Sequence, residues 1–325
     1  MIFLYLLPSF ALVFKRKPTD IKGNYYAHGK VLLTGEYAVL DGAKAIALPT
    51  KKGQSLTFKQ NKGSDIVWKA YDHLGEEWFS AKISLFDFAA IKTTDEETAQ
   101  RLKKLLKNAV RLNSEFLSKW NGFKVETRLE FPNNWGLGSS STLTYLVAQW
   151  ADVHPLLLHF KNSNGSGYDV ACAGADGPIY YKLEDGTINW EEIDYNPSFK
   201  KHLHFVHLGK KQSSEDGIKY YSKTVKKKAE FVKESNQMAT EMERCTSLKG
   251  FIKLIAENEL MVSKALKLET CKSTHFSDFN GEIKSLGAWG GDFVLAASEM
   301  DSEDVKAYFA KKGFDQCLSY DEFVL

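Results

Sequence analysis

Two glycines and three consecutive serines precede an apolar stretch in the segment PNNWGLGSSSTLTYLVAQW, residues 132–150. The apolar residues have helical spacing, so the segment predicts a glycine turn that leads into the N-terminus of a helix. Such an end presents unpaired N–H groups and the positive end of the helix dipole, and glycines let a phosphate approach the backbone. This chemistry favours a phosphate-binding loop over residues 136–141. A plain glycine turn, with Ser140 or Ser141 as the helix cap, explains the same residues.

The loop lacks the lysine of a Walker A motif and the third glycine of a dinucleotide fingerprint. The elements around it are expected to be β-rich at first, because short apolar runs alternate with Gly, Asp and Asn. Strands are predicted at residues 30–40, 43–49, 54–59, 65–71, 76–83 and 123–131. Apolar residues recur on one helical face over 94–120, which predicts a long amphipathic helix, and a second helix is expected over 142–153.

The order of elements changes after residue 200. A strand is predicted at 202–208, followed by helical stretches at about 213–235 and 247–268 and a glycine-rich segment at 285–298. A helix from Asp304 and a last strand complete the chain. This change predicts two domains of α+β type, residues 25–198 and 199–325, with residues 1–24 as an appendage.

Composition narrows the functional classes. In 325 residues, 43 Lys and Arg balance 41 Asp and Glu, which gives no sign of a nucleic-acid partner or of a polybasic membrane patch. The four cysteines are far apart and fit neither a disulfide framework nor a zinc site, so a cytoplasmic protein is expected. The composition leaves the oligomeric state open.

The N-terminal segment is apolar over residues 1–14 and basic from Lys15, the reverse of the charge order in a signal peptide. It is also short for a bilayer span, so stable membrane insertion is not expected. Three interpretations stay open: a start codon placed too early, a membrane-touching anchor, or a segment packed on the body. Every motif lies downstream of Tyr25, so we expect the segment to be dispensable for activity.

Three segments in order, residues 29–49, 132–144 and 286–298, resemble the motifs of the GHMP kinases, the superfamily that includes galactokinase, homoserine kinase, mevalonate kinase and phosphomevalonate kinase. The resemblance covers roughly residues 25–320. It implies a two-domain α+β fold, with an N-terminal ATP-binding domain like domain 2 of ribosomal protein S5 and a ferredoxin-like C-terminal domain. It also implies ATP and Mg²⁺ as cofactors and a small acidic molecule as substrate.

Within that superfamily, the segment GSGYDVA at 165–171 is similar to the GSGFDVA pattern of phosphomevalonate kinases, and mevalonate kinases usually carry PSG there. The GEYAVL segment at 35–40 and Asp292 after the paired glycines favour the same branch. The resemblance therefore implies a kinase in the mevalonate pathway that acts on 5-phosphomevalonate. Mevalonate kinase is the alternative, and a homologue that binds nucleotide or phosphate without turnover is another.

The resemblance also assigns roles to residues. Asp169 matches the catalytic aspartate, and Lys30 matches the lysine that stabilises the acceptor and the migrating phosphoryl group. An Asx turn at Asp169 and a solvated strand-end lysine at Lys30 are the structural alternatives. The nucleotide phosphates would be bound by the glycine loop, namely Gly136, Leu137, Gly138, Ser139, Ser140 and Ser141, with the Ser140 hydroxyl on the metal.

The substrate side is less sharply marked. The resemblance places there Glu36 and Lys210, Ser213 at a helix start, and Gly290 and Gly291 in the third motif. A plain helix N-cap at Ser213 or Ser214 explains the residues 209–214 equally well.

The chain departs from the mevalonate kinases in one respect, since it has no glutamate between Glu130 and Glu184 to match their metal-binding glutamate. Leu158 occupies that neighbourhood, and Gln149 and Asp152 are the nearest polar candidates. Mg²⁺ would then be held by Ser140, the nucleotide oxygens and water.

Overall fold

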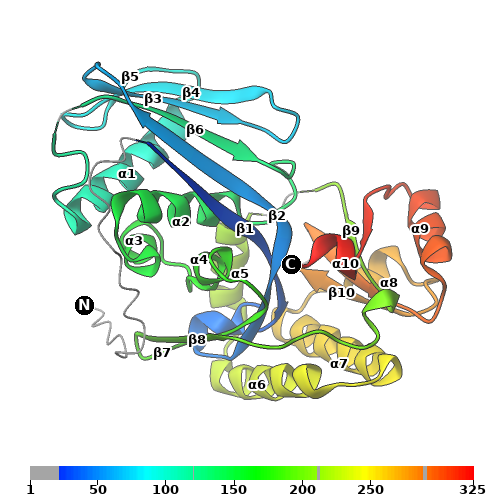
Figure 1. Ribbon diagram of the computed structural model, residues 1–325. Coiled ribbons are helices and arrows are strands. Elements are labelled where there is room, and N and C mark those ends of the chain that lie inside the picture. Colours follow the sequence, from blue (N-terminus) through cyan, green and yellow to red (C-terminus); the bar gives the residue numbers. More distant parts are fainter. Residues whose placement is uncertain (1–21, 120, 211–212, 288–290) are drawn as a thin grey trace.

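The computed structural model describes residues 22–119, 121–210, 213–287 and 291–325. Within these ranges the chain forms two sheets with helices packed on them (Figure 1). Most of the predicted N-terminal appendage lies outside the described residues. None of the helices in these ranges has the length and hydropathy needed to span a bilayer.

The first sheet has the strand order β5-β4-β3-β6-β2-β7-β8, with β1 paired to β2. All its pairs are antiparallel except β3 with β6. The strands are β1 (Lys22–Thr34), β2 (Ala45–Gln60), β3 (Asp65–Tyr71), β4 (Glu77–Ser84), β5 (Ala90–Thr93), β6 (Phe123–Leu129), β7 (Ile179–Glu184) and β8 (Thr187–Glu192). The runs 43–49 and 54–59 belong to one continuous strand, because the intervening residues keep an extended backbone, although the register with β1 shifts between His28 and Lys30.

Helices cover one side of this sheet. They are α1 (Glu96–Leu112), α2 (Ser139–Ala151), α3 (Pro155–Asn162) and α4 (Tyr168–Ala173), after a short 3₁₀ helix at Ala38–Asp41. The alternation of β3 turns Ile66, Trp68 and Ala70 toward α1 and α2. The predicted helix over 94–120 is too long, since α1 ends where Asn113 becomes extended.

The second sheet has the order β10-β11-β9-β12, all antiparallel. Its strands are β9 (Leu203–His207), β10 (Glu282–Leu286), β11 (Phe293–Ala297) and β12 (Cys317–Ser319). The helices of this half are α5 (Ser214–Thr224), α6 (Lys228–Arg244), α7 (Leu248–Leu266), α8 (Cys271–His275), α9 (Ser302–Lys311) and α10 (Tyr320–Phe323). The predicted helical stretch 213–235 is split because Val225, a β-branched residue, takes an extended conformation between α5 and α6.

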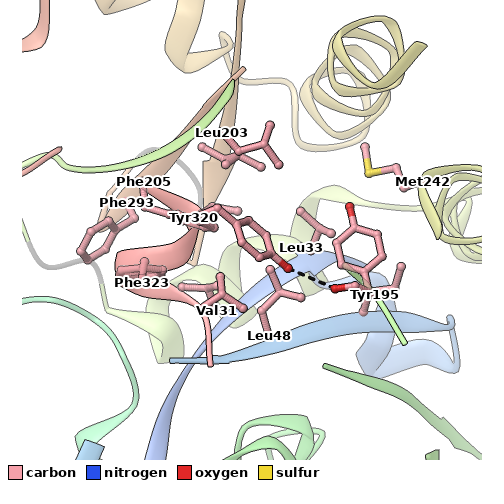
Figure 2. Close-up of a cluster of buried hydrophobic side chains, with 14 of the residues drawn as sticks. Val31, Leu33, Leu48, Tyr195, Leu203, Phe205, Met242, Phe293, Tyr320 and Phe323 are labelled. Carbon is pink, nitrogen blue, oxygen red and sulfur yellow. Dashed lines mark hydrogen bonds between the residues drawn. The ribbon is translucent and has the colours of Figure 1, made fainter. Parts of the chain in front are cut away.

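One apolar cluster joins the two sheets (Figure 2). Val31, Leu33 and Leu48 of the first sheet pack with residues of the second half, including Phe205 and Phe323, whose rings stack at 4.3 Å between centroids. The chain end is attached to β2 as well, because the Leu325 N–H donates to the Pro49 carbonyl at 3.0 Å. The first strands of the chain and its last residues are thus parts of the same core. The domain boundary at residue 198 stays a prediction.

Candidate active site

The glycine loop leads directly into α2, as predicted, but the helix cap differs from the expectation. Gly138 is the N-cap, with φ 88° and ψ 41°, and no side chain caps the helix. Ser140 and Ser141 lie inside the first turn, so the predicted serine cap is wrong. Only glycine enters this left-handed conformation at low cost, and an added Cβ would lie 2.5 Å from the Ser141 hydroxyl. The turn lets α2 begin at Ser139.

The first-turn N–H groups of α2 therefore remain available. The Thr142 N–H donates to the Gly138 carbonyl at 2.9 Å, while the N–H groups of Ser139, Ser140 and Ser141 have no acceptor among the described residues. The buried Ser141 hydroxyl donates to the Gly138 carbonyl at 2.8 Å. The Ser140 hydroxyl is exposed. Three unpaired donors at a helix N-terminus form a site for an anion.

Lys30 lies against this loop from β1. Its backbone N–H donates to the Leu137 carbonyl at 3.0 Å, and its ammonium donates to the Gly136 carbonyl at 3.1 Å. The side chain is buried, so Lys30 is not a solvated lysine at a strand end. Burial alone would lower the pKa of the ammonium, but Tyr168, Asp169 and Asp292 outweigh it and raise the pKa. Lys30 therefore keeps its charge beside the loop.

Asp169 lies in the first turn of α4. Gly167 precedes it as the N-cap with φ 88°, and an added Cβ there would lie 3.1 Å from the Leu156 side chain. One Asp169 oxygen accepts from the Val170 N–H at 3.0 Å, and the side chain is half-buried. This contact is with the next residue, whereas an Asx turn requires the N–H two residues on, so the Asx turn predicted as the alternative is not formed. The contact leaves the other carboxylate oxygen without a recorded partner in the described residues, and the residue faces the cleft described below.

Asp292 is a second carboxylate near Lys30. It is buried, and it packs between two glycines of positive φ, Gly136 of the loop and Gly287 at the end of β10. An added Cβ at Gly136 would collide with the Asp292 carboxyl group, and one at Gly287 would lie 2.7 Å from its Oδ2. Both glycines are thus required by close approach. Asp292 fixes the position of the glycine loop relative to the second sheet.

These elements surround one cleft of about 630 Å³. Most of the predicted site residues line it: Lys30, Glu36, Gly136, Leu137, Gly138, Ser139, Ser140, Ser141, Asp169 and Ser213. Lys210 and Gly291 do not line it. Lys210 is exposed beyond the end of β9, and Gly291 is buried. Gly290 lies outside the described residues. The structure therefore brings together the predicted phosphate loop and the two predicted catalytic side chains.

Ser213 is the N-cap of α5, since its hydroxyl accepts from the Asp216 N–H at 3.2 Å. This was the alternative interpretation of the segment. Because Ser213 also lines the cleft, capping and substrate contact are both compatible with its position.

Glu36 lines the cleft but is nearly fully buried. One of its oxygens forms an ion pair with the Lys284 ammonium and accepts from the Asn258 amide at 3.4 Å. The other oxygen has no hydrogen-bond partner among the described residues. Lys284 is also 3.9 Å from Glu259, which accepts from the N–H and the hydroxyl of Ser285, each at 3.0 Å. We call Glu36, Lys284 and Glu259 the buried charge cluster.

Arg101, Tyr168 and His159 are among the cleft residues that were not predicted from the sequence. Arg101 of α1 enters the cleft with its exposed side chain 2.6 Å from Glu97, and the helical pattern marked it only as part of the polar face. Tyr168 lies 5.8 Å from the Lys30 ammonium, measured to the ring centroid. The Nε2–H of His159 donates to the Gly165 carbonyl at 3.2 Å. Only Tyr168 carried a signal, since it stands beside Asp169 in the GSGYD segment.

The candidates for an additional metal ligand do not reach the cleft. Asp152 is the C-cap of α2 and Gln149 is in its last turn, about 20 Å along the helix from the glycine loop. Leu158 is fully buried in the core. Across the described ranges, no three His, Cys, Asp or Glu side chains converge as a metal site. The exposed Ser140 hydroxyl and the Asp169 carboxylate are oxygen donors on the same cleft, and this donor set fits Mg²⁺ held mainly by phosphates and water.

No protein-family model and no curated protein matches the chain. Solved structures do. A crystal structure of a mevalonate kinase has a TM-score of 0.67 at 18% identity, over 91% of this chain and 99% of that chain. Phosphomevalonate kinase of Streptococcus pneumoniae, in complex with phosphomevalonate and AMPPNP, gives 0.67 at 15% identity over 90% and 97%. Galactokinase of Lactococcus lactis, complexed with galactose, gives 0.62 at 14% identity over 91% and 89%.

The chain has the GHMP kinase fold. The predicted resemblance and the predicted α+β architecture are thereby confirmed. Residues from all three motifs of the GHMP kinase pattern line the cleft, as shown by Lys30, Gly138 and Asp292.

Proposed function

We propose that this chain is an ATP- and Mg²⁺-dependent kinase that phosphorylates a small acidic molecule, with 5-phosphomevalonate as the favoured acceptor. The observation that carries the proposal is the convergence, in one cleft, of the open N-terminus of α2, the charged Lys30 and the Asp169 carboxylate. Phosphoryl transfer needs a cradle for the phosphates, a cation for the developing charge and a group that orients the acceptor.

The glycine loop supplies the cradle. The N–H groups of Ser139, Ser140 and Ser141 point out of the first turn of α2 and donate to phosphate oxygens, and the helix dipole adds to their attraction. Ser140 adds its exposed hydroxyl. When bound, Mg²⁺ would neutralise charge on the phosphates, with Ser140 and Asp169 as the oxygen donors from the protein.

Lys30 and Asp169 act on the reacting groups. The ammonium of Lys30 is held in place by the Gly136 carbonyl, so it offers its other N–H donors to the oxygens on which charge develops. Asp169 keeps one carboxylate oxygen without a recorded partner and accepts the proton of the acceptor hydroxyl. Lys30 also balances part of the negative charge of Asp169 and Asp292 before substrate enters.

The choice of acceptor is supported by the GSGYD segment and by the likeness to a phosphomevalonate kinase structure. Within the proposal, the enzyme is cytoplasmic, which agrees with four free cysteines, two of them buried. Mevalonate is the second acceptor to test, because a mevalonate kinase structure is equally similar.

The test is a coupled assay of ADP release from ATP with 5-phosphomevalonate, mevalonate, homoserine and galactose as acceptors. We expect the highest kcat/KM with 5-phosphomevalonate and no turnover without Mg²⁺. A higher kcat/KM with mevalonate would exchange the two acceptors within the same reaction class. Binding of ATP without turnover of any acceptor would leave a nucleotide-binding protein and contradict the proposed kinase.

A further inference from the structure

The open side of the first sheet, turned away from α1 and α2, carries an unusual row of lysines. Residues paired directly across neighbouring strands point to the same face. The second half covers this face near Val31 and Leu48, but no described helix covers it over β5, β4, β3 and β6 (Figure 1). Following the register from β1 through β2, β6, β3 and β4 to β5 gives one continuous line, which we call the lysine row. It consists of Lys22, Lys59, Lys124, Val67, Lys82 and Lys92.

The lysine row is exposed and poorly neutralised. All five lysines are exposed, and only Lys82 has an ion pair within the described ranges, at 3.1 Å from Asp65. The other acidic side chains nearby are paired with other cations. Glu77 lies 2.6 Å from Lys69, and Glu126 lies 2.9 Å from Arg128. Four positive charges of the row therefore face solvent.

This arrangement costs stability. Like charges directly opposite each other on adjacent strands repel, and the row contains three such contacts, Lys22 with Lys59, Lys59 with Lys124, and Lys82 with Lys92. A face whose only role is exposure to solvent would be more stable with alternating positive and negative charges. With strands about 4.8 Å apart, the row runs for about 24 Å across the sheet. A flat anionic surface would relieve the repulsion along its whole length.

The sequence next to the lysine row indicates which kind of anionic surface it would bind. The chain enters the row at Lys22, and the residues before it are apolar over 1–14 and basic at Lys15, Arg16 and Lys17. An apolar segment combined with a basic face gives the two attachments that peripheral membrane binding requires. Trp78 of β4, an aromatic type enriched at membrane interfaces, is exposed on the same face. A nucleic acid would use the lysines but not the apolar segment.

We propose that the lysine row is a docking face for an anionic lipid surface, reinforced by the apolar N-terminal segment. The net charge of +2 gives no sign of this face. The lysines are far apart in the sequence, and only the pairing of the strands brings them together. Docking would turn the open sheet toward the membrane and leave the cleft, on the helix-covered side, accessible to small molecules.

The test compares full-length variants by sedimentation with vesicles. One variant combines Lys59→Gln, Lys92→Gln and Lys124→Gln. Its matched control combines Lys226→Gln, Lys233→Gln and Lys249→Gln, three exposed lysines of the second half. We expect wild type and control to bind phosphatidylserine-containing vesicles and to bind phosphatidylcholine vesicles far more weakly. Since each lysine near an anionic surface contributes about fivefold, the row variant should bind about a hundredfold more weakly.

Thermal unfolding checks that the row variant is folded. We expect its melting temperature to be unchanged or slightly higher, because the variant loses like-charge contacts. Equal vesicle binding by the row variant and the control would overturn the proposal. So would tighter binding of wild type to a single-stranded oligonucleotide than to anionic vesicles, with the same loss in the row variant. The experiment uses no kinase activity, so its outcome is independent of the proposed reaction.

Discussion

Charged side chains occupy two contrasting environments within a short distance of the first motif. In the cleft, Lys30 is surrounded by Tyr168, Asp169 and Asp292, and the carboxylate of Asp169 is half-exposed. In the buried charge cluster, Lys284 and its two glutamates have almost no contact with solvent. Glu36 belongs to both, since it lines the cleft and pairs with Lys284.

The difference shows how the same residue types serve two purposes. The cleft charges keep donors and acceptors free for a ligand, as the unpaired N–H groups of α2 illustrate. The charges of the buried cluster are used on each other, and they connect the turn after β1 with α7 and β10 of the second half. The first set should therefore govern binding and turnover, and the second should govern stability.

The largest effect is expected when the buried cluster is broken. Lys284→Met removes the only cation that the described residues place in the cluster and leaves Glu36 as an unpaired buried charge, which costs about 3–5 kcal/mol of unfolding free energy. Denaturant unfolding measures the loss. The exposed pair of Lys312 with Asp278, 2.7 Å apart, is the control, and Lys312→Met should cost about 1 kcal/mol or less.

A second variant separates lost pairing from lost packing. Adding Glu36→Gln to Lys284→Met removes the unpaired charge, so part of the stability should return. No recovery in the double variant would show that the cluster acts through side-chain packing and not through charge.

The next effect concerns the cleft and should leave stability almost unchanged. Asp169→Asn keeps the shape and the contact with the Val170 N–H but removes the base, so we expect kcat to fall by about a hundredfold or more, which corresponds to about 2.7 kcal/mol. ATP affinity should change little. Steady-state kinetics and nucleotide binding are measured on the same preparation, with the exposed Asp176→Asn as control. A kcat near that of wild type would reduce Asp169 to a residue of the first turn of α4 without a catalytic role.

A smaller effect is expected at the phosphate loop. Gly138→Val places a branched side chain at φ 88° beside the Ser141 hydroxyl, where phosphate oxygens approach, so ATP binding should weaken by about 2 kcal/mol or more. Gly75→Val is the control variant for the effect of backbone strain alone. Gly75 has φ 86° on the β3–β4 turn, and an added Cβ there meets nothing within 4 Å. Calorimetric titration with ATP should separate the two variants, and equal affinities would contradict the loop assignment.

The sequence was most informative where a pattern is local. Strand 65–71 was predicted with the bounds of β3, because alternation is unbroken there, and the glycine loop was placed correctly before α2. The helix break at Val225 was missed, since both flanks have helical composition. The Glu36–Lys284 pair joins residues 248 positions apart, and no local pattern marks it. Arg101 likewise resembles any exposed helix residue until α1 is packed beside the cleft.

The smallest effect is expected at Glu259, the member of the buried charge cluster whose carboxyl group holds its proton near pH 7. Burial, with a contribution from Glu282, raises the pKa of Glu259 to about 8, although Ser285 donates to both of its oxygens. Burial also lowers the pKa of Lys284 to about 7. A carboxyl group whose pKa is raised in the folded state binds its proton more tightly there than in the unfolded chain. Its contribution to stability is complete below a pH of about 4.5 and is lost as the pH rises through about 8.

Glu259→Gln resembles the protonated side chain and can still accept from the Ser285 N–H, so at pH 5 we expect a change in unfolding free energy below about 1 kcal/mol. Between pH 5 and pH 7 the wild type should lose stability relative to the variant, because only the wild type releases a proton from this position on unfolding. Thermal or urea unfolding across this range measures the difference, and the exposed Glu303→Gln is the control that should show none. Lys284, with a lowered pKa, changes stability in the opposite direction and above pH 7, so it does not interfere in this window. A Glu259→Gln variant that loses several kcal/mol at every pH would show that Glu259 is ionised and that the cluster carries two negative charges. The contrast between a neutralised interior and an open, charged cleft would then disappear.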